Sequence, residues 1–190
     1  MIKIALVGDI GSGKSYIAKL FGYPVFNADN EVVNIYKKDK SCFIKLKKKL
    51  QYNFTTFPLK KNELINSILQ DNNNLKLITN IVHPLIRKKL KKFIKNNNKQ
   101  KIVVLDIPLY LENKLNNEND VIVFVQSKKK DILKRLTKRK GYNKLLLNIF
   151  KRIQVSIEKK KKKSQFIIKN DFTKRTALKY VRYILKRVLK

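Results

Sequence analysis

Short apolar runs alternate with longer amphipathic segments along the chain. The short runs are bounded by turn residues and predict strands at residues 2–7, 23–26, 102–106, 120–125 and 165–169. Apolar residues at helical spacing predict helices at residues 15–21, 31–50 (interrupted near 39–41), 64–69, 75–82, 84–94, 128–140, 143–158 and 173–189, with Pro84 in the first turn of its helix. Because strands alternate with helices, the pattern predicts an α/β fold with a mainly parallel five-stranded sheet.

The helical stretch at residues 31–98 is too long for a simple crossover between parallel strands. We interpret it as an inserted lobe that binds a second substrate, within a single domain whose core comprises residues 1–30 and 99–190. The apolar runs are too short to span a bilayer, and the start of the chain lacks the features of a signal peptide. The single cysteine, Cys42, cannot form an internal disulfide. We therefore expect a cytoplasmic protein.

The formal net charge of +33 makes nucleic acid a possible partner. Of the 46 basic residues, however, 39 are lysine and only 7 are arginine, the residue that makes bidentate contacts to phosphates and bases. Lysine, asparagine and isoleucine dominate the composition, and all three are encoded by codons rich in A and T. We interpret the charge as compositional bias and expect no specific nucleic-acid partner. The run at residues 159–163 is expected to be a solvated helix end or loop.

A glycine-rich loop follows the first strand directly and precedes the first helix. It reads Gly8-Asp-Ile-Gly-Ser-Gly-Lys-Ser15. Its backbone N–H groups are expected to converge on phosphate oxygens, with Lys14 reaching the β- and γ-phosphates of ATP and the Ser15 hydroxyl contacting Mg²⁺. The strand–loop–helix context indicates a P-loop NTPase fold, a three-layer sandwich, and an ATP-binding kinase.

Two carboxylates end predicted strands on the same edge of the sheet as this loop. Asp106 is expected either to hold Mg²⁺ or to contact the phosphate acceptor, and the alternative is an ordinary strand-end Asp that caps a turn. Asp29 is expected to accept the proton of an acceptor hydroxyl, and its alternative is a cap for the helix that starts near Glu31. The sequence pattern leaves both alternatives open.

Two arginines, Arg135 and Arg139, lie one predicted helical turn apart and are expected to share one helix face. There they could close over the transferring phosphate as part of a lid at residues 135–160. The alternative is a solvated basic helix.

The motifs together resemble the dephospho-coenzyme A kinase family, in family order and over nearly the whole chain. The resemblance rests on the glycine loop, Asn27-Ala-Asp29, His83-Pro84-Leu85-Ile86-Arg87, Asp106-Ile107-Pro108-Leu109-Tyr110-Leu111-Glu112, Arg135-Leu136-Thr137-Lys138-Arg139 and Ile167-Ile168-Lys169-Asn170. It implies phosphorylation of the ribose 3′-hydroxyl of dephospho-coenzyme A by ATP with Mg²⁺. We expect a monomer, with a small homo-oligomer as the alternative.

The resemblance also implies a role for each matching residue. The catalytic residues would be Lys14, Asp29 and Arg139, and the metal would be held by Ser15 and Asp106. Nucleotide contacts would come from Gly11, Ser12, Gly13, Lys14, Ser15, Tyr16, Arg135 and Asn170. Contacts to the acceptor would come from His83, Arg87, Asp106, Pro108, Leu109 and Glu112.

Five positions depart from the family pattern: Val7, Asp9, Tyr16, Ser156 and Gln165. They leave the reaction class intact and bear on the details of nucleotide contact. Two other functions stay open on the residues alone. One is a P-loop kinase for another small molecule, of the nucleoside monophosphate or shikimate type. The other is a nucleic-acid-binding ATPase, suggested by the charge.

Overall fold

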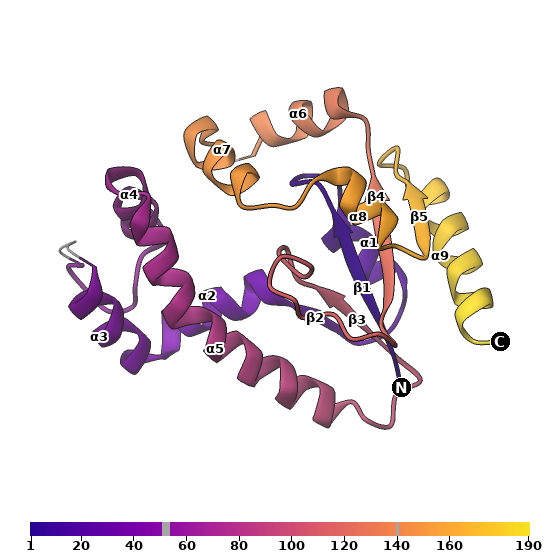
Figure 1. Ribbon diagram of the computed structural model, residues 1–190, viewed down its shortest axis with the longest axis horizontal. Coiled ribbons are helices and arrows are strands. Elements are labelled where there is room, and N and C mark those ends of the chain that lie inside the picture. The colour runs from indigo at the N-terminus through magenta and orange to yellow at the C-terminus, as the bar shows by residue number, and fades with distance from the viewer. Residues whose placement is uncertain (51–53, 140) are drawn as a thin grey trace.

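A five-stranded, fully parallel sheet lies at the centre of the computed structural model, which describes residues 1–50, 54–139 and 141–190 (Figure 1). The strands are β1 (Ile2–Gly8), β2 (Val25–Asn27), β3 (Ile102–Asp106), β4 (Val121–Gln126) and β5 (Phe166–Lys169), in the order β2-β3-β1-β4-β5. The predicted sheet is confirmed. Its central strand, β1, lies between β3 and β4 and ends at the glycine loop, so the loop emerges at the point where the connections diverge.

The side chains of β1 alternate between two cores. Ile4 and Leu6 pack against helices α1 (Lys14–Leu20) and α9 (Lys174–Val188) on one face of the sheet. Ala5 and Val7 point into the core on the other face, which continues among the helices between β2 and β3. Because residues 4–7 of the strand are buried on both faces, they are continuously apolar and not alternating. The molecule is therefore a three-layer α/β structure.

Four helices between β2 and β3 form a lobe beside the sheet (Figure 1). They are α2 (Ala28–Lys38), α3 (Lys40–Lys49), α4 (Lys61–Gln70) and α5 (Asn73–Asn96). The interruption predicted near 39–41 is present, because Asp39 ends α2 and its carboxylate accepts the backbone N–H of Cys42 to cap α3.

The prediction that Pro84 begins a new helix is wrong, because α5 runs through it without a break. Proline removes one backbone donor and normally ends or kinks a helix. Here Ile78 and Val82 before it and Ile86 after it are buried in the same core, so one continuous apolar stripe holds both halves together.

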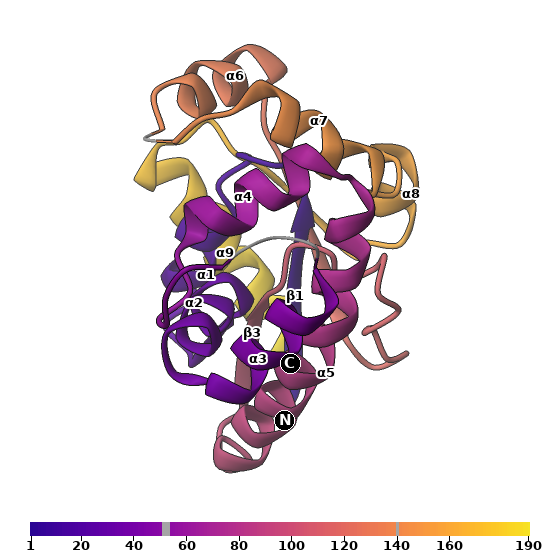
Figure 2. The ribbon, with the colours of Figure 1, turned by 90° about the vertical axis from the view of Figure 1, so that its left-hand side faces the viewer.

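The segment predicted as one helix at residues 143–158 is two helices, α7 (Lys144–Arg152) and α8 (Ile157–Lys162). The Ser156 hydroxyl accepts the backbone N–H of Lys159 and caps the start of α8. The chain is therefore not helical between α7 and α8. Before them, α6 (Lys129–Thr137) stops short of the predicted end at residue 140, which lies outside the described residues. Figure 2 shows α6 and α7 lying across the end of the sheet at which the glycine loop emerges. No helix within the described ranges is long and apolar enough to cross a membrane.

The central strand gives a test of this packing. We expect Leu6→Ala to lower the free energy of unfolding by about 2–5 kcal/mol, because Leu6 is fully buried and the cavity left cannot fill completely. Urea titration measures the loss. The control Ile44→Ala, at an isoleucine that is 63% exposed on α3, should change stability by less than about 0.5 kcal/mol. Equal losses in both variants would contradict the assignment of the core.

Candidate active site

The carbonyl group of Ser12 fixes the conformation of the glycine loop through two hydrogen bonds. The backbone oxygen of Ser12 accepts hydrogen bonds from the Ser127 hydroxyl (3.0 Å) and the Asn170 side-chain amide (2.8 Å). Gly13, with φ of +96°, follows in a left-handed conformation, and a Cβ placed on it would lie 2.6 Å from the Asn170 amide nitrogen. Only glycine fits this position.

Lys14 closes back over its own loop. Its ammonium donates to the carbonyl oxygens of Asp9 (2.8 Å) and Gly8 (3.3 Å). Burial lowers the pKa of Lys14. The negative charge of Asp106 opposes this shift, whereas the positive charge of Lys160 adds to it. The ammonium is thus a positive charge pre-placed at the mouth of the loop.

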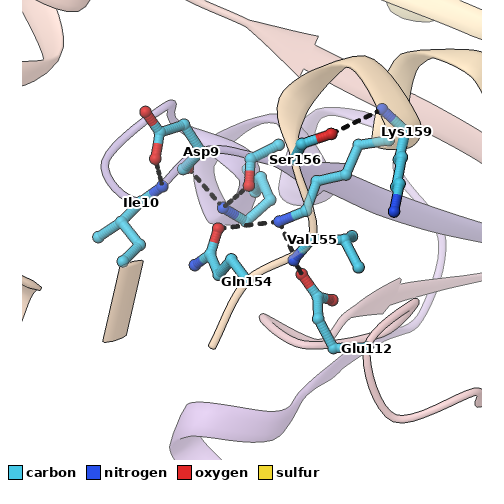
Figure 3. Close-up of polar contacts among 10 residues, drawn as sticks. Asp9, Ile10, Glu112, Gln154, Val155, Ser156 and Lys159 are labelled. Carbon is cyan, nitrogen blue, oxygen red and sulfur yellow. Dashed lines mark hydrogen bonds and ion pairs between the residues drawn. The ribbon is translucent and has the colours of Figure 1, made fainter. Parts of the chain in front are cut away.

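The unexpected carboxylate in the loop has a local partner. Asp9 accepts the backbone N–H of Ile10 at 2.7 Å (Figure 3). That N–H is therefore occupied by the protein's own carboxylate. Asp9 is absent from the residues that line the cavity described next, but its negative charge still raises the pKa of Lys14.

A cavity of about 860 Å³ lies between the glycine loop, the helical lobe and the segment that follows α6. Most of the residues expected to form the site line it, although they come from five separate parts of the chain. These residues are Gly11, Gly13, Lys14, Ser15, Tyr16, Asp29, His83, Arg87, Asp106, Pro108, Leu109, Arg135 and Arg139. One cavity therefore joins the phosphate loop to the interior of the inserted lobe.

The two carboxylates come together because β2 and β3 end side by side. Asn27 pairs with Asp106 in the sheet register, and its amide donates to the Asp106 carboxylate. The same Asn27 caps α2 by accepting the N–H of Asn30, so Asn27 and not Asp29 is the helix cap. Asp29 is left free to face the cavity. Its partial enclosure by protein raises its pKa, and the negative charge of Asp106 raises it further.

The helical lobe contributes the other polar wall. His83 and Arg87 lie one turn apart on α5 and both line the cavity. Burial lowers the pKa of His83, and the positive charge of Arg87 lowers it further, so the imidazole is neutral at neutral pH. A neutral His83 is a hydrogen-bonding group here and not a cation.

The two arginines after the loop do not share a helix face as expected. Arg135 lies in the last turn of α6, whereas Arg139 follows the helix end at Thr137, in a turn where its N–H donates to Leu136. Both nevertheless line the cavity. The guanidinium of Arg135 stacks over the ring of Phe172 at 4.3 Å from the ring centroid, and Phe172 itself has a positive φ of 65°.

Three of the expected site residues lie outside the cavity lining: Ser12, Asn170 and Glu112. Ser12 and Asn170 are buried and hold the loop as described above. The Glu112 carboxylate pairs with Lys160 at 2.9 Å and accepts the backbone N–H of Val155 at 3.1 Å.

Some residues that line the cavity were not predicted from the sequence. Phe150, Ile153 and Gln154 form part of the wall, in and just after α7. The only sequence signal for them is the apolar face of an amphipathic helix, which is equally typical of ordinary core packing. Gln154, not Ser156, is the polar side chain that this segment presents to the cavity.

The oxygen donors suit a hard cation. Ser15 supplies a hydroxyl and Asp106 a carboxylate to the same cavity, whereas no cluster of three or more His, Cys, Asp or Glu side chains occurs among the residues described. Mg²⁺ typically takes one or two protein oxygens and completes its shell with water and substrate phosphates. The donor set therefore fits Mg²⁺ better than Zn²⁺.

The parallel sheet, the phosphate loop at its central strand and a cavity shared with carboxylates define a P-loop kinase. A family model described as dephospho-CoA kinase matches residues 2–175. The chain belongs to the dephospho-CoA kinase family.

A relative in sequence agrees with this assignment, and two solved structures share the fold. The chain is 35% identical to a dephospho-CoA kinase of Wolbachia pipientis wMel, over 96% of this chain and 95% of the relative. A crystal structure of a Thermus thermophilus protein superimposes with a TM-score of 0.78 at 23% identity, covering 100% of this chain and 98% of that one. A dephospho-CoA kinase from Campylobacter jejuni gives 0.66 at 21% identity, covering 98% and 96%.

Two glycines provide a matched test of the loop. Gly13 and Gly22 both have left-handed φ, but a Cβ on Gly22 would meet nothing within 4 Å. We expect Gly22→Ala to cost about 1–2 kcal/mol of unfolding free energy from backbone strain alone. Gly13→Ala should cost more, because the new methyl group also displaces Asn170 from Ser12. Urea titration of both variants decides the point, and equal losses would mean that the Asn170 contact does not constrain the loop.

Proposed function

We propose that this chain transfers the γ-phosphoryl group of ATP to the 3′-hydroxyl of the ribose of dephospho-coenzyme A, giving coenzyme A and ADP, the last step of coenzyme A synthesis. The observation that carries the proposal is the single cavity that joins the phosphate loop and Asp29 to the helical lobe. Family membership supports the identity of the acceptor.

The phosphate side of the site is assigned to the glycine loop. Backbone N–H groups of residues 11–15 and the ammonium of Lys14 would bind the β- and γ-phosphates, with the N-terminus of α1 directed at them. Ser15 and Asp106 would hold Mg²⁺, which when bound supplies a positive charge that neutralises the phosphates. Arg135 and Arg139 would contribute charge from the opposite wall.

The acceptor side is assigned to Asp29 and the helical lobe. Asp29 would accept the proton of the 3′-hydroxyl as that oxygen attacks the γ-phosphorus. A raised pKa suits this role, since a base is most effective when its pKa approaches the working pH. His83, Arg87, Pro108 and Leu109 would orient the acceptor. Residues 31–98 would then be the acceptor-binding insertion of a single 1–190 domain.

Two competing functions make different demands on the same site. A kinase for another small molecule would use the same loop and differ only in the helical lobe. A nucleic-acid-binding ATPase would need a basic groove rich in arginine or aromatic residues. An enclosed cavity is more typical of a small-molecule site than of a nucleic-acid groove, and family membership favours dephospho-coenzyme A over another small acceptor. We further expect a monomeric, cytoplasmic enzyme that acts on a small molecule and needs no specific nucleic acid.

Release of ADP against a panel of acceptors tests the proposal. Dephospho-coenzyme A should be the preferred acceptor over shikimate and nucleoside monophosphates, and added DNA or RNA should not stimulate turnover. Lys14→Ala serves as the control: it should stay folded and lose at least about 100-fold in kcat, because it removes a charge that acts on the transition state. Preference for another acceptor, or ATP hydrolysis that depends on nucleic acid, would overturn the proposal.

The role of Asp29 has its own test in the pH dependence. The active form is the carboxylate, so kcat should fall as pH decreases through the pKa of Asp29 in the complex. Because that pKa is raised, the midpoint should lie above the ordinary Asp value of 3.8. Asp29→Asn should lower kcat by about 10²–10⁴-fold and abolish this acid limb. A variant that keeps its kcat would show that Asp29 is not the base.

A further inference from the structure

One lysine within the basic run at residues 159–163 differs from its neighbours. Lys160 is only 4% exposed, whereas Lys159, Lys162 and Lys163 are exposed on α8 or just after it. The expectation of a solvated run is therefore wrong at this position. Burial of an ammonium group costs free energy unless the group is paired and hydrogen-bonded. The partners of Lys160 therefore indicate which segments it connects.

The partners of Lys160 come from two connections that are far apart in the sequence. Its ammonium lies 2.9 Å from a carboxylate oxygen of Glu112, in the loop after β3, and donates to the side-chain oxygen of Gln154 at 2.8 Å. The same Glu112 oxygen accepts the backbone N–H of Val155 (Figure 3). Glu112, Lys160 and Gln154 therefore form a buried clamp between the β3–β4 connection and the segment that joins α7 to α8.

This clamp reaches the cavity at one end. Gln154 lines the cavity beside Ile153, and both belong to the segment that Lys160 and Glu112 hold. Helix α8 also packs on β1, the strand that leads into the phosphate loop. The positive charge of Lys160 acts on Lys14, whose pKa is lowered first by burial and further by Lys160. Lys160 is thus close enough to the phosphate loop to contribute to its field.

We propose that Lys160 is a positioning residue for phosphoryl transfer, which holds Gln154 in the cavity wall and, anchored by Glu112, keeps a fixed positive charge beside that of Lys14. The inference rests on the proposed function, because it assigns this charge to the phosphates of ATP. It also gives Glu112 a role that acts through Lys160 and not through direct contact with the acceptor. A fixed charge in a largely enclosed site stabilises a developing anion more than a mobile surface charge does.

The test compares Lys160→Met with Lys162→Met, which removes an exposed lysine from the same run. We expect Lys160→Met to lower kcat by roughly 10- to 100-fold, with a smaller rise in KM for ATP, because misplacement of the wall affects the transition state most. Lys162→Met should match the wild type within about twofold. Lys160→Arg, which keeps the charge, should recover part of the lost kcat.

A second variant separates positioning from folding, since removal of one partner of a buried ion pair can itself destabilise the protein. The double variant Glu112→Leu/Lys160→Met removes both charges and should regain much of the stability lost in Lys160→Met, as measured by urea titration, while kcat stays low. If the double variant regains both stability and kcat, or if Lys160→Met keeps a wild-type kcat, the clamp is only structural and the inference is overturned.

Failure of the proposed function can be distinguished from failure of this inference. Absence of transfer to dephospho-coenzyme A by the wild type would overturn that function and leave Lys160 to be judged on ATP binding alone. In that case the Kd for ATP, measured by calorimetry, should be roughly five- to tenfold higher in Lys160→Met than in Lys162→Met, as for the loss of one charged contact. Equal Kd values would overturn the inference.

Discussion

The site depends on the two hydrogen bonds that the Ser12 carbonyl accepts. For backbone N–H groups of the loop to converge on an anion, the carbonyls between them must point away, and a buried carbonyl needs a partner. Ser127, just after β4, and Asn170, just after β5, provide these partners. The loop at the end of β1 is thereby fixed to the ends of two other strands. Asn170 packs so closely on Gly13 that only glycine fits at residue 13. Asn170 thus affects the shape of the loop although it does not line the cavity.

Much of the fold follows from local sequence, because buried parallel strands are continuous apolar runs and the glycine loop marks the end of the first one. Three features did not follow. These are the continuity of α5 through Pro84, the break between α7 and α8, and the burial of Lys160. The first and the last depend on contacts with distant segments. The break combines the local Ser156 cap with the bond from the Val155 N–H to Glu112, which is distant in the sequence. The residues expected at the site mostly line one cavity, since parallel strands bring their carboxyl ends to the same edge. The position of Gln154 in the cavity wall was not predicted, because an amphipathic pattern does not indicate which polar residue at the end of a helix faces a cavity.

The burial of Lys160 also refines the interpretation of the charge. Among the residues that the structure describes, Lys160 is the only lysine that is buried, and the others lie at least partly in solvent. Exposed charges more than about 8 Å apart are largely screened at physiological ionic strength. A surface of this kind is consistent with compositional bias. Under the proposed function, the positive charge that bears on the phosphates would come from a few groups beside the loop, chiefly Lys14 and Lys160, so the net charge says little about the chemistry of the site.

The same contacts distinguish an anchored part of the cavity wall from an exposed part. Leu136 packs closely on Gly11, and Val155 is held by Glu112, so the chain is anchored at both of these points. Between them, Arg139 is exposed, whereas Leu146 and Ile149 of α7 are partly buried against the core. Arg139 therefore belongs to the part of the wall that faces solvent. Gln154 belongs to the part that Lys160 and Glu112 hold.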